Sequence, residues 1–152
     1  MLIKDVFIPK LTTIESTATM NEAEKMMRLN GFRHLPVSDG EKLVGIISDR
    51  DIKLATVVGV RDNKKEGYIH SFKLVSEFMS SPVLKAKTTD RVDHVVRNMV
   101  NLKVSCFVIE DEKGEDVGIL TTEDFLITLL DVLDQKVSIF TKIKSIFLPA
   151  KS

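Results

Sequence analysis

The chain has 152 residues, of which 43% are hydrophobic and 29% charged, and its 22 basic and 22 acidic residues cancel to a net charge of zero. This is the composition of a folded globular domain, and the lack of a basic excess argues against nucleic-acid binding. No apolar run is long enough for a membrane span, the N-terminus lacks a secretion signal, and a single cysteine, Cys106, excludes internal disulfides and multi-thiolate metal sites. We therefore expect a cytoplasmic protein without a bound metal.

The first half of the chain predicts a strand, a helix, two strands and a second helix. The first helix has apolar residues at i, i+3 and i+4 spacing and begins with a capping box, Thr19 with Glu22. The two middle strands are joined by a turn at 38–40. A polar, turn-rich segment follows and reads as an exposed linker. The expected elements lie at 12–14, 20–30, 33–37, 42–47 and 49–58.

The second half repeats this order at an offset of 72 residues, which becomes 73 after one extra residue in the turn at 110–114. Apolar positions meet apolar positions and Gly45 meets Gly118, as expected for a duplication whose one slip falls in a turn. The expected elements lie at 83–86, 92–102, 105–109, 117–120 and 122–133.

The segment from Gln135 to Pro149 has no counterpart in the first half. Val137, Phe140, Ile143 and Phe147 are spaced as one apolar face of a helix, with lysines elsewhere. Three partners for this face remain open: the chain's own repeats, a second subunit, or an anionic membrane surface.

One motif occurs twice, in the form Gly-apolar-apolar-Ser/Thr-x-x-Asp, at 45–51 and 118–124. Each copy lies where a buried strand is expected to end and a helix to begin. One interpretation is a capping box, which only stabilises the helix N-terminus. The other is a ligand site, because free N–H groups and the helix dipole favour an anion and a carboxylate can accept hydrogen bonds from a ribose diol.

The repeat length, the β-α-β-β-α order, the strand Leu35-Pro36-Val37 and the doubled motif together resemble the CBS domain family over about residues 1–131, and the two copies resemble its tandem pair, or Bateman module. The resemblance implies an α+β fold in which two repeats pack sheet to sheet with pseudo-two-fold symmetry, followed by a C-terminal helix. The expected parts are repeat 1 at 1–60, a linker at 61–73, repeat 2 at 74–131 and a C-terminal amphipathic helix and tail at 132–152.

By this resemblance, two clefts between the repeats hold an adenosyl ligand such as AMP, ADP, ATP, S-adenosylmethionine or a dinucleotide. Asp51 and Asp124 match the family's ribose-binding aspartate, and Ser48 and Thr121 match the hydroxyl beside it. Adenine is expected in an apolar slot near the first strands. The ligand-binding candidates are Arg33, His34, Val37, Ser48, Arg50, Asp51, Ala86, Ser105, Cys106, Ile109, Thr121 and Asp124.

The two clefts are expected to differ. The positions that approach phosphate hold Arg33 and His34 in repeat 1 but Ser105 and Cys106 in repeat 2. In the family these positions face the aspartate of the other copy, so Asp124 with Arg33 and His34 is the better-equipped anion site. Residues 74–131 hold 6 basic and 11 acidic groups, so an anionic ligand should prefer the cleft that Arg33 reaches.

Cys106 and the acidic run at 110–116 each allow two interpretations. Cys106 reads as a small buried side chain or as a reactive thiol. The acidic run at 110–116 reads as a solvated hairpin turn or as a cation site.

The leading hypothesis is a stand-alone regulatory, energy-sensing module that binds an adenosyl ligand and signals by conformational change to an unidentified partner protein. No catalytic motif is recognisable, so neither enzymatic activity nor an obligatory cofactor is expected. The alternative is a dimerisation or docking scaffold with degenerate sites that acts through its C-terminal helix. The resemblance implies a homodimer in either case, and binding to nucleic acid or to a membrane surface is not expected.

Overall fold

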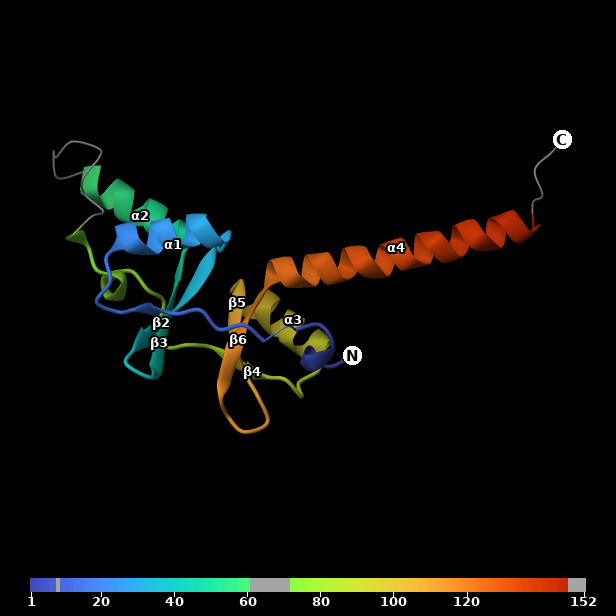
Figure 1. Ribbon diagram of the computed structural model, residues 1–152, viewed down its shortest axis with the longest axis horizontal. Helices are drawn as coiled ribbons and strands as arrows, with labels where there is room; N and C mark the ends of the chain where they lie inside the picture. Colours follow the sequence, from blue (N-terminus) through green and yellow to red (C-terminus); the bar gives the residue numbers. More distant parts are fainter. Residues whose placement is uncertain (8, 61–71, 148–152) are drawn as a thin grey trace.

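The computed structural model describes residues 1–7, 9–60 and 72–147, and the side chains of all of these except 56–60 and 136–147 (Figure 1). Two short 3-10 helices, Ile3–Asp5 and Val75–Glu77, open the two repeats. The strands and longer helices are, in chain order, β1 (Ile14–Glu15), α1 (Met20–Asn30), β2 (His34–Asp39), β3 (Lys42–Ser48), α2 (Asp49–Val60), β4 (Lys85–Lys87), α3 (Val92–Leu102), β5 (Cys106–Glu110), β6 (Asp116–Thr121) and α4 (Thr122–Phe147).

The strands form two sheets of three, in the orders β1-β2-β3 and β4-β5-β6. In each sheet the first strand is parallel to the second, and the second is antiparallel to the third. The register repeats as well, because Ile14 pairs with Val37 while Ala86 pairs with Ile109. The predicted α+β fold with two β-α-β-β-α repeats is confirmed.

Local signals account for the ends of α1. The Thr19 hydroxyl accepts from the Glu22 N–H at 3.2 Å, and the Glu22 carboxylate accepts from the Thr19 N–H at 2.8 Å, which confirms the predicted capping box. Gly31 ends the helix in the left-handed conformation, at φ 69°. Met20 and Met27 face the first core from this helix.

The opening segments of the two repeats are exchanged. The Ile3 N–H donates to the Asp90 carbonyl at 2.9 Å, and Ile3 and Phe7 are buried in the core of repeat 2. Val75 is buried in the core of repeat 1, and Phe78 packs against it. The sequence repeats at 1–60 and 74–131 are therefore not separate packing units, because each core is completed by the other repeat.

This exchange explains the glycine of the doubled motif. A Cβ at Gly118 would lie 2.8 Å from Phe7 Cζ and 2.9 Å from the Lys10 carbonyl oxygen, and a Cβ at Gly45 would lie 2.9 Å from the Ser80 carbonyl oxygen. At both positions the opening segment of the other repeat crosses the strand too closely for any side chain. β1 and β4 each begin two residues later and end one residue later than predicted.

Helix α4 differs most from the prediction. A helix at 122–133 and a separate C-terminal segment were expected, but one helix of 26 residues runs to Phe147. Figure 1 shows it extending away from both sheets. The apolar face predicted at 137–147 lies outside the described side chains. Within the described residues, none of the helices combines the length and hydrophobicity that crossing a membrane requires.

Candidate functional site

Both copies of the doubled motif fold as capping boxes. Asp51 Oδ2 accepts from the Ser48 N–H at 2.8 Å and from the Ser48 hydroxyl at 2.6 Å. Asp124 Oδ2 accepts from the Thr121 N–H at 2.7 Å and from the Thr121 hydroxyl at 2.8 Å. In each aspartate the other oxygen, Oδ1, has no partner among the described residues. Capping and ligand binding are therefore compatible, because each function needs a different oxygen.

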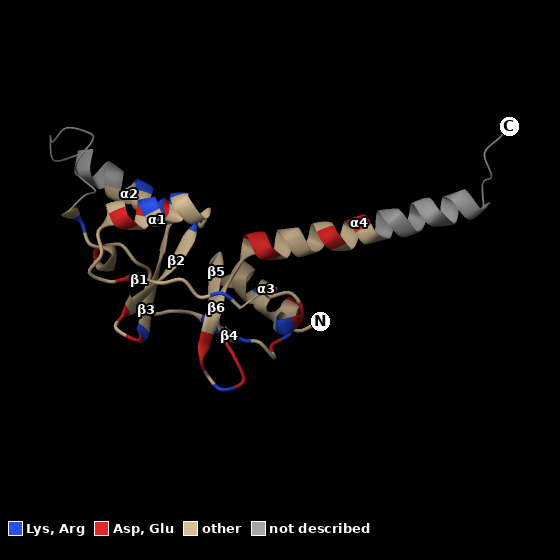
Figure 2. Cartoon of the chain, in the orientation of Figure 1, with Lys and Arg blue, Asp and Glu red and all other residues tan. Residues whose placement is uncertain are grey.

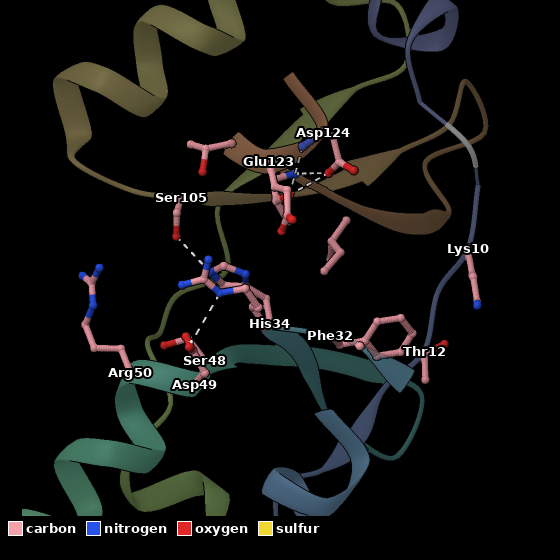
Figure 3. Close-up of a pocket in the computed structure, with 15 residues that line it drawn as sticks. Lys10, Thr12, Phe32, His34, Ser48, Asp49, Arg50, Ser105, Glu123 and Asp124 are labelled. Atoms are coloured by element: carbon pink, nitrogen blue, oxygen red, sulfur yellow. Dashed lines mark hydrogen bonds and ion pairs between the residues drawn. The ribbon is translucent and has the colours of Figure 1, made fainter. Parts of the chain in front are cut away.

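A cleft of about 430 Å³ lies between the two repeats, where α2 and α4 begin (Figure 3). Its walls come from β2, β3 and α2 of repeat 1 and from β6 and α4 of repeat 2. Seven of the twelve candidate residues line it, namely Arg33, His34, Ser48, Arg50, Ser105, Thr121 and Asp124. The expected juxtaposition of Asp124 with Arg33 and His34 is thus present in the folded chain.

The other five candidates lie outside this lining. Val37, Ala86, Cys106 and Ile109 are buried in the strands, and Asp51 is half-buried in the first turn of α2. Their part in ligand binding stays a prediction.

Several lining residues were not anticipated. Lys10 and Thr12 enter the cleft from the exchanged opening segment, which sequence periodicity alone does not reveal. Asp49 and Glu123 lie inside the doubled motif and could have been found from it, since each is one or two residues from a candidate. The remaining unanticipated residues are Gly31, Phe32, Ile119 and Thr122.

His34 joins the two repeats inside the cleft. Its Nε2 lies 2.9 Å from the Ser105 hydroxyl oxygen, as a hydrogen-bonded pair (Figure 3). Burial lowers the pKa of His34, and the nearby Asp49 carboxylate opposes that shift only in part. His34 therefore contributes a hydrogen bond rather than a positive charge near neutral pH.

Arg33, the residue next to His34, already has an ion-pair partner in Asp49. Arg33 Nε lies 3.6 Å from Asp49 Oδ2, and Lys53 Nζ lies 3.4 Å from the same oxygen. Arg33 is largely exposed, so this pair adds little stability, but Asp49 offsets its charge at the mouth of the cleft.

The sequence allows two interpretations of Cys106, a packed side chain or a reactive thiol. Burial, with the Asp124 carboxylate, raises the pKa of the Cys106 thiol to about 12, so the thiol stays protonated and fits the packing interpretation.

The sequence also allows two interpretations of the acidic hairpin at 110–116, a solvated turn or a cation site. Lys85 Nζ lies 3.0 Å from Glu110 and 2.8 Å from Asp116. Among the described residues, no group of three or more His, Cys, Asp or Glu side chains is placed to hold a metal ion.

Comparisons with known proteins agree with this architecture. The CBS domain family model matches residues 3–58 and 75–131. The chain is 33% identical over 124 residues to an L-aspartate semialdehyde sulfurtransferase of Methanocaldococcus jannaschii, which covers 81% of this chain but only 22% of that enzyme. It is 30% identical over 137 residues to a CBS domain-containing protein of Dictyostelium discoideum, covering 88% of this chain and 94% of that protein.

A solved structure matches as well. The CBS domain pair of protein MJ0100, crystallised with 5′-methylthioadenosine and S-adenosyl-L-methionine, superposes with a TM-score of 0.69 at 32% identity, over 85% of this chain and 95% of that one.

Proposed function

Because this chain belongs to the CBS domain family and carries a tandem pair of its repeats, we propose that it is a regulatory module that binds an adenosyl ligand in the cleft between the repeats and passes the change to a partner protein. The activities named for the enzymes it resembles belong to proteins several times its length, of which it matches about a fifth to a quarter.

The observation that carries the proposal is the meeting of Asp124 from repeat 2 with Arg33 and His34 from repeat 1 in one cleft. Asp124 Oδ1 supplies an acceptor for a ribose hydroxyl, while Oδ2 keeps the start of α4 ordered. The relative at 32% identity that was crystallised with two adenosyl compounds supports the same ligand class.

A bound ligand can change the arrangement of the two repeats, because both repeats contribute walls to the cleft. A ligand that touches Asp124 and Arg33 together binds both repeats, so it favours the arrangement in which those contacts coexist. Such a ligand shifts an equilibrium only if its affinity differs between two arrangements. The exchanged opening segment, through Lys10 and Thr12, also joins the cleft to the core of repeat 2.

Calorimetric titration with AMP, ATP, S-adenosylmethionine and 5′-methylthioadenosine tests the proposal. We expect the wild type to bind at least one of them, and Asp124→Asn to weaken that binding about tenfold, the effect of losing one charge-assisted hydrogen bond. Asparagine keeps an acceptor for Thr121, so α4 stays capped.

Asp90→Asn is the matched control, because Asp90 caps the Lys87 N–H at 2.8 Å outside the cleft. Its affinity should equal that of the wild type. A wild type that binds none of the four compounds, or an Asp124→Asn variant that binds as tightly as the control, would refute the proposal.

A second role, as a homodimer held through α4, is favoured by one observation. Five large apolar side chains on the first turns of this helix are 47–61% exposed: Leu126, Ile127, Leu129, Leu130 and Leu133. Exposed apolar area of this extent usually marks an interface. The described side chains of α4 include acidic groups and no basic one, whereas α1 and α2 present charges of both signs (Figure 2), so the exposed apolar side chains, and not charge, favour this contact.

Light scattering on a Leu126→Glu/Leu130→Glu variant tests this role. We expect a dimer for the wild type and a monomer for the variant, because two charges would have to be buried at the contact. The control, Asn98→Asp/Asn101→Asp, adds the same charge at exposed polar positions of α3 and should stay dimeric. A monomeric wild type, or an unchanged mass in the leucine variant, would rule this interface out.

A further inference from the structure

The charged groups that line the cleft cancel. Lys10, Arg33 and Arg50 provide three cations, and Asp49, Glu123 and Asp124 provide three carboxylates. His34 adds a hydrogen bond rather than a charge. This balance differs from the expectation of a positively charged anion site, because Asp49 and Glu123 bring two carboxylates that the doubled motif had not drawn attention to.

Some of these charged side chains interact with another side chain of the protein, and others do not. Arg33 is paired with Asp49 at 3.6 Å, and Lys10 stands over the Phe32 ring, 5.4 Å from its centre. Arg50 and Glu123, in contrast, have no ion-pair partner among the residues that the structure describes. These two groups are therefore the ones most available to a ligand.

Arg50 and Glu123 occupy equivalent positions in the two repeats, each being the second residue of a helix that starts at the cleft. The duplication thus carries opposite charges at one position. Figure 3 shows the two side chains reaching the cleft from opposite walls, Arg50 from α2 and Glu123 from α4. A ligand lying between them meets a positive group on one side and a negative group on the other.

A phosphate chain fits this arrangement poorly. Its negative charge would lie close to Glu123 and Asp124, in a repeat that already has an excess of acidic groups, and partial exclusion of water strengthens that repulsion. An amino-acid substituent fits well, because its carboxylate suits Arg50 and the N-terminus of α2 while its ammonium group suits Glu123.

We propose that the ligand is an adenosyl compound whose 5′ substituent carries no net negative charge, either a zwitterionic amino acid or a neutral thioether, rather than a nucleotide phosphate. This inference rests on the proposed function and narrows the ligand class of the same cleft. Arg50 and Glu123 are the residues that set the selectivity.

The test compares dissociation constants of the wild type for four probes: AMP, ATP, S-adenosylmethionine and 5′-methylthioadenosine. We expect at least one of the two sulfur compounds to bind about tenfold more tightly than either phosphate, as one unit charge at short range across a partly hydrated cleft would give. If S-adenosylmethionine binds more tightly, its sulfonium cation and its amino acid together account for the preference; if 5′-methylthioadenosine does, the neutral thioether suffices.

The Glu123→Gln variant tests the residue responsible. Removing its charge should improve AMP binding several-fold and so reduce the preference for the sulfur compounds over the phosphates. If the amino acid is recognised, the affinity for S-adenosylmethionine should also fall. Glu112→Gln, in the exposed hairpin far from the cleft, removes the same charge and should keep the wild-type preference.

Two kinds of result would contradict the inference, and they have different consequences for the proposed function. Tighter binding of AMP or ATP than of both sulfur compounds, or an unchanged preference in Glu123→Gln, would overturn the charge selectivity while leaving the proposed function intact. Failure of all four probes to bind the wild type would overturn the proposed function and this inference with it.

Discussion

His34 links protonation to the contact between the repeats. Its ring is half-buried and hydrogen-bonded to Ser105 at 2.9 Å, and burial lowers its pKa from the ordinary value of 6.5. The folded chain therefore holds the neutral ring to a lower pH than the unfolded chain does. As the pH falls below 6.5, the unfolded chain takes up the proton first and the folded state loses relative stability, until the pH has passed the lowered pKa.

The pH dependence of stability tests this linkage. Between about pH 7.5 and about pH 5.5, the urea midpoint of the wild type should fall more than that of His34→Asn, which cannot titrate there. His94→Asn, at an exposed position of α3, should follow the wild type. Equal pH dependence in the wild type and His34→Asn would show that burial of this ring does not penalise its charged form.

The doubled motif made its main residues predictable from the sequence. The spacing of Ser48 with Asp51 and of Thr121 with Asp124 predicted both caps, because their geometry is local, and Ser48, Thr121 and Asp124 also line the cleft. Lys10 was not predictable in this way, since its place depends on the opening segment crossing to the other repeat. Glu123 was overlooked although its equivalence to Arg50 is readable from the offset.

The exchange of the opening segments is the main feature at the scale of elements. Ile3 is 0% exposed and belongs to the core of repeat 2, although it precedes repeat 1 in the sequence. Cys106 lies in that same repeat as a buried single thiol, so its rate of chemical modification reports how often the repeat opens.

Replacing Ile3 by alanine should therefore loosen repeat 2. We expect Ile3→Ala to lower the free energy of unfolding by about 3 kcal/mol and to accelerate labelling of Cys106 under native conditions. Ile47→Ala is the matched control, because Ile47 is equally buried but lies in the core of repeat 1. If Ile47→Ala accelerated the labelling as much as Ile3→Ala does, the opening segment would not belong preferentially to repeat 2.

The elements themselves were predicted well where local patterns decide them. The helices α1 and α3 and the paired strands follow from apolar spacing and capping. The predicted helix at 122–133 and the predicted C-terminal helical face are parts of one helix, α4, because no helix-breaking residue lies between them. The bounds of β1 and β4 differ from the prediction by one or two residues at each end, which is the usual uncertainty at the ends of an element.

At the scale of the whole molecule, the duplicated motif forms the walls of the cleft, and the positions where the two repeats differ determine which ligand the cleft prefers. Two copies of one unit place the starts of α2 and α4 around the cleft described above. Substitutions since the duplication, Arg50 against Glu123 and Arg33 against Ser105, make its two walls chemically different. The zero net charge of the chain thus conceals opposed charges inside the cleft.

The central claim is that this cleft binds an adenosyl ligand. A crystal structure of the chain grown with whichever of the four probes binds most tightly tests it directly. We expect the ribose hydroxyls within hydrogen-bond distance of Asp124 Oδ1, with the 5′ substituent between Arg50 and Glu123. An empty cleft under saturating ligand, or a ligand bound away from Asp124, would contradict it.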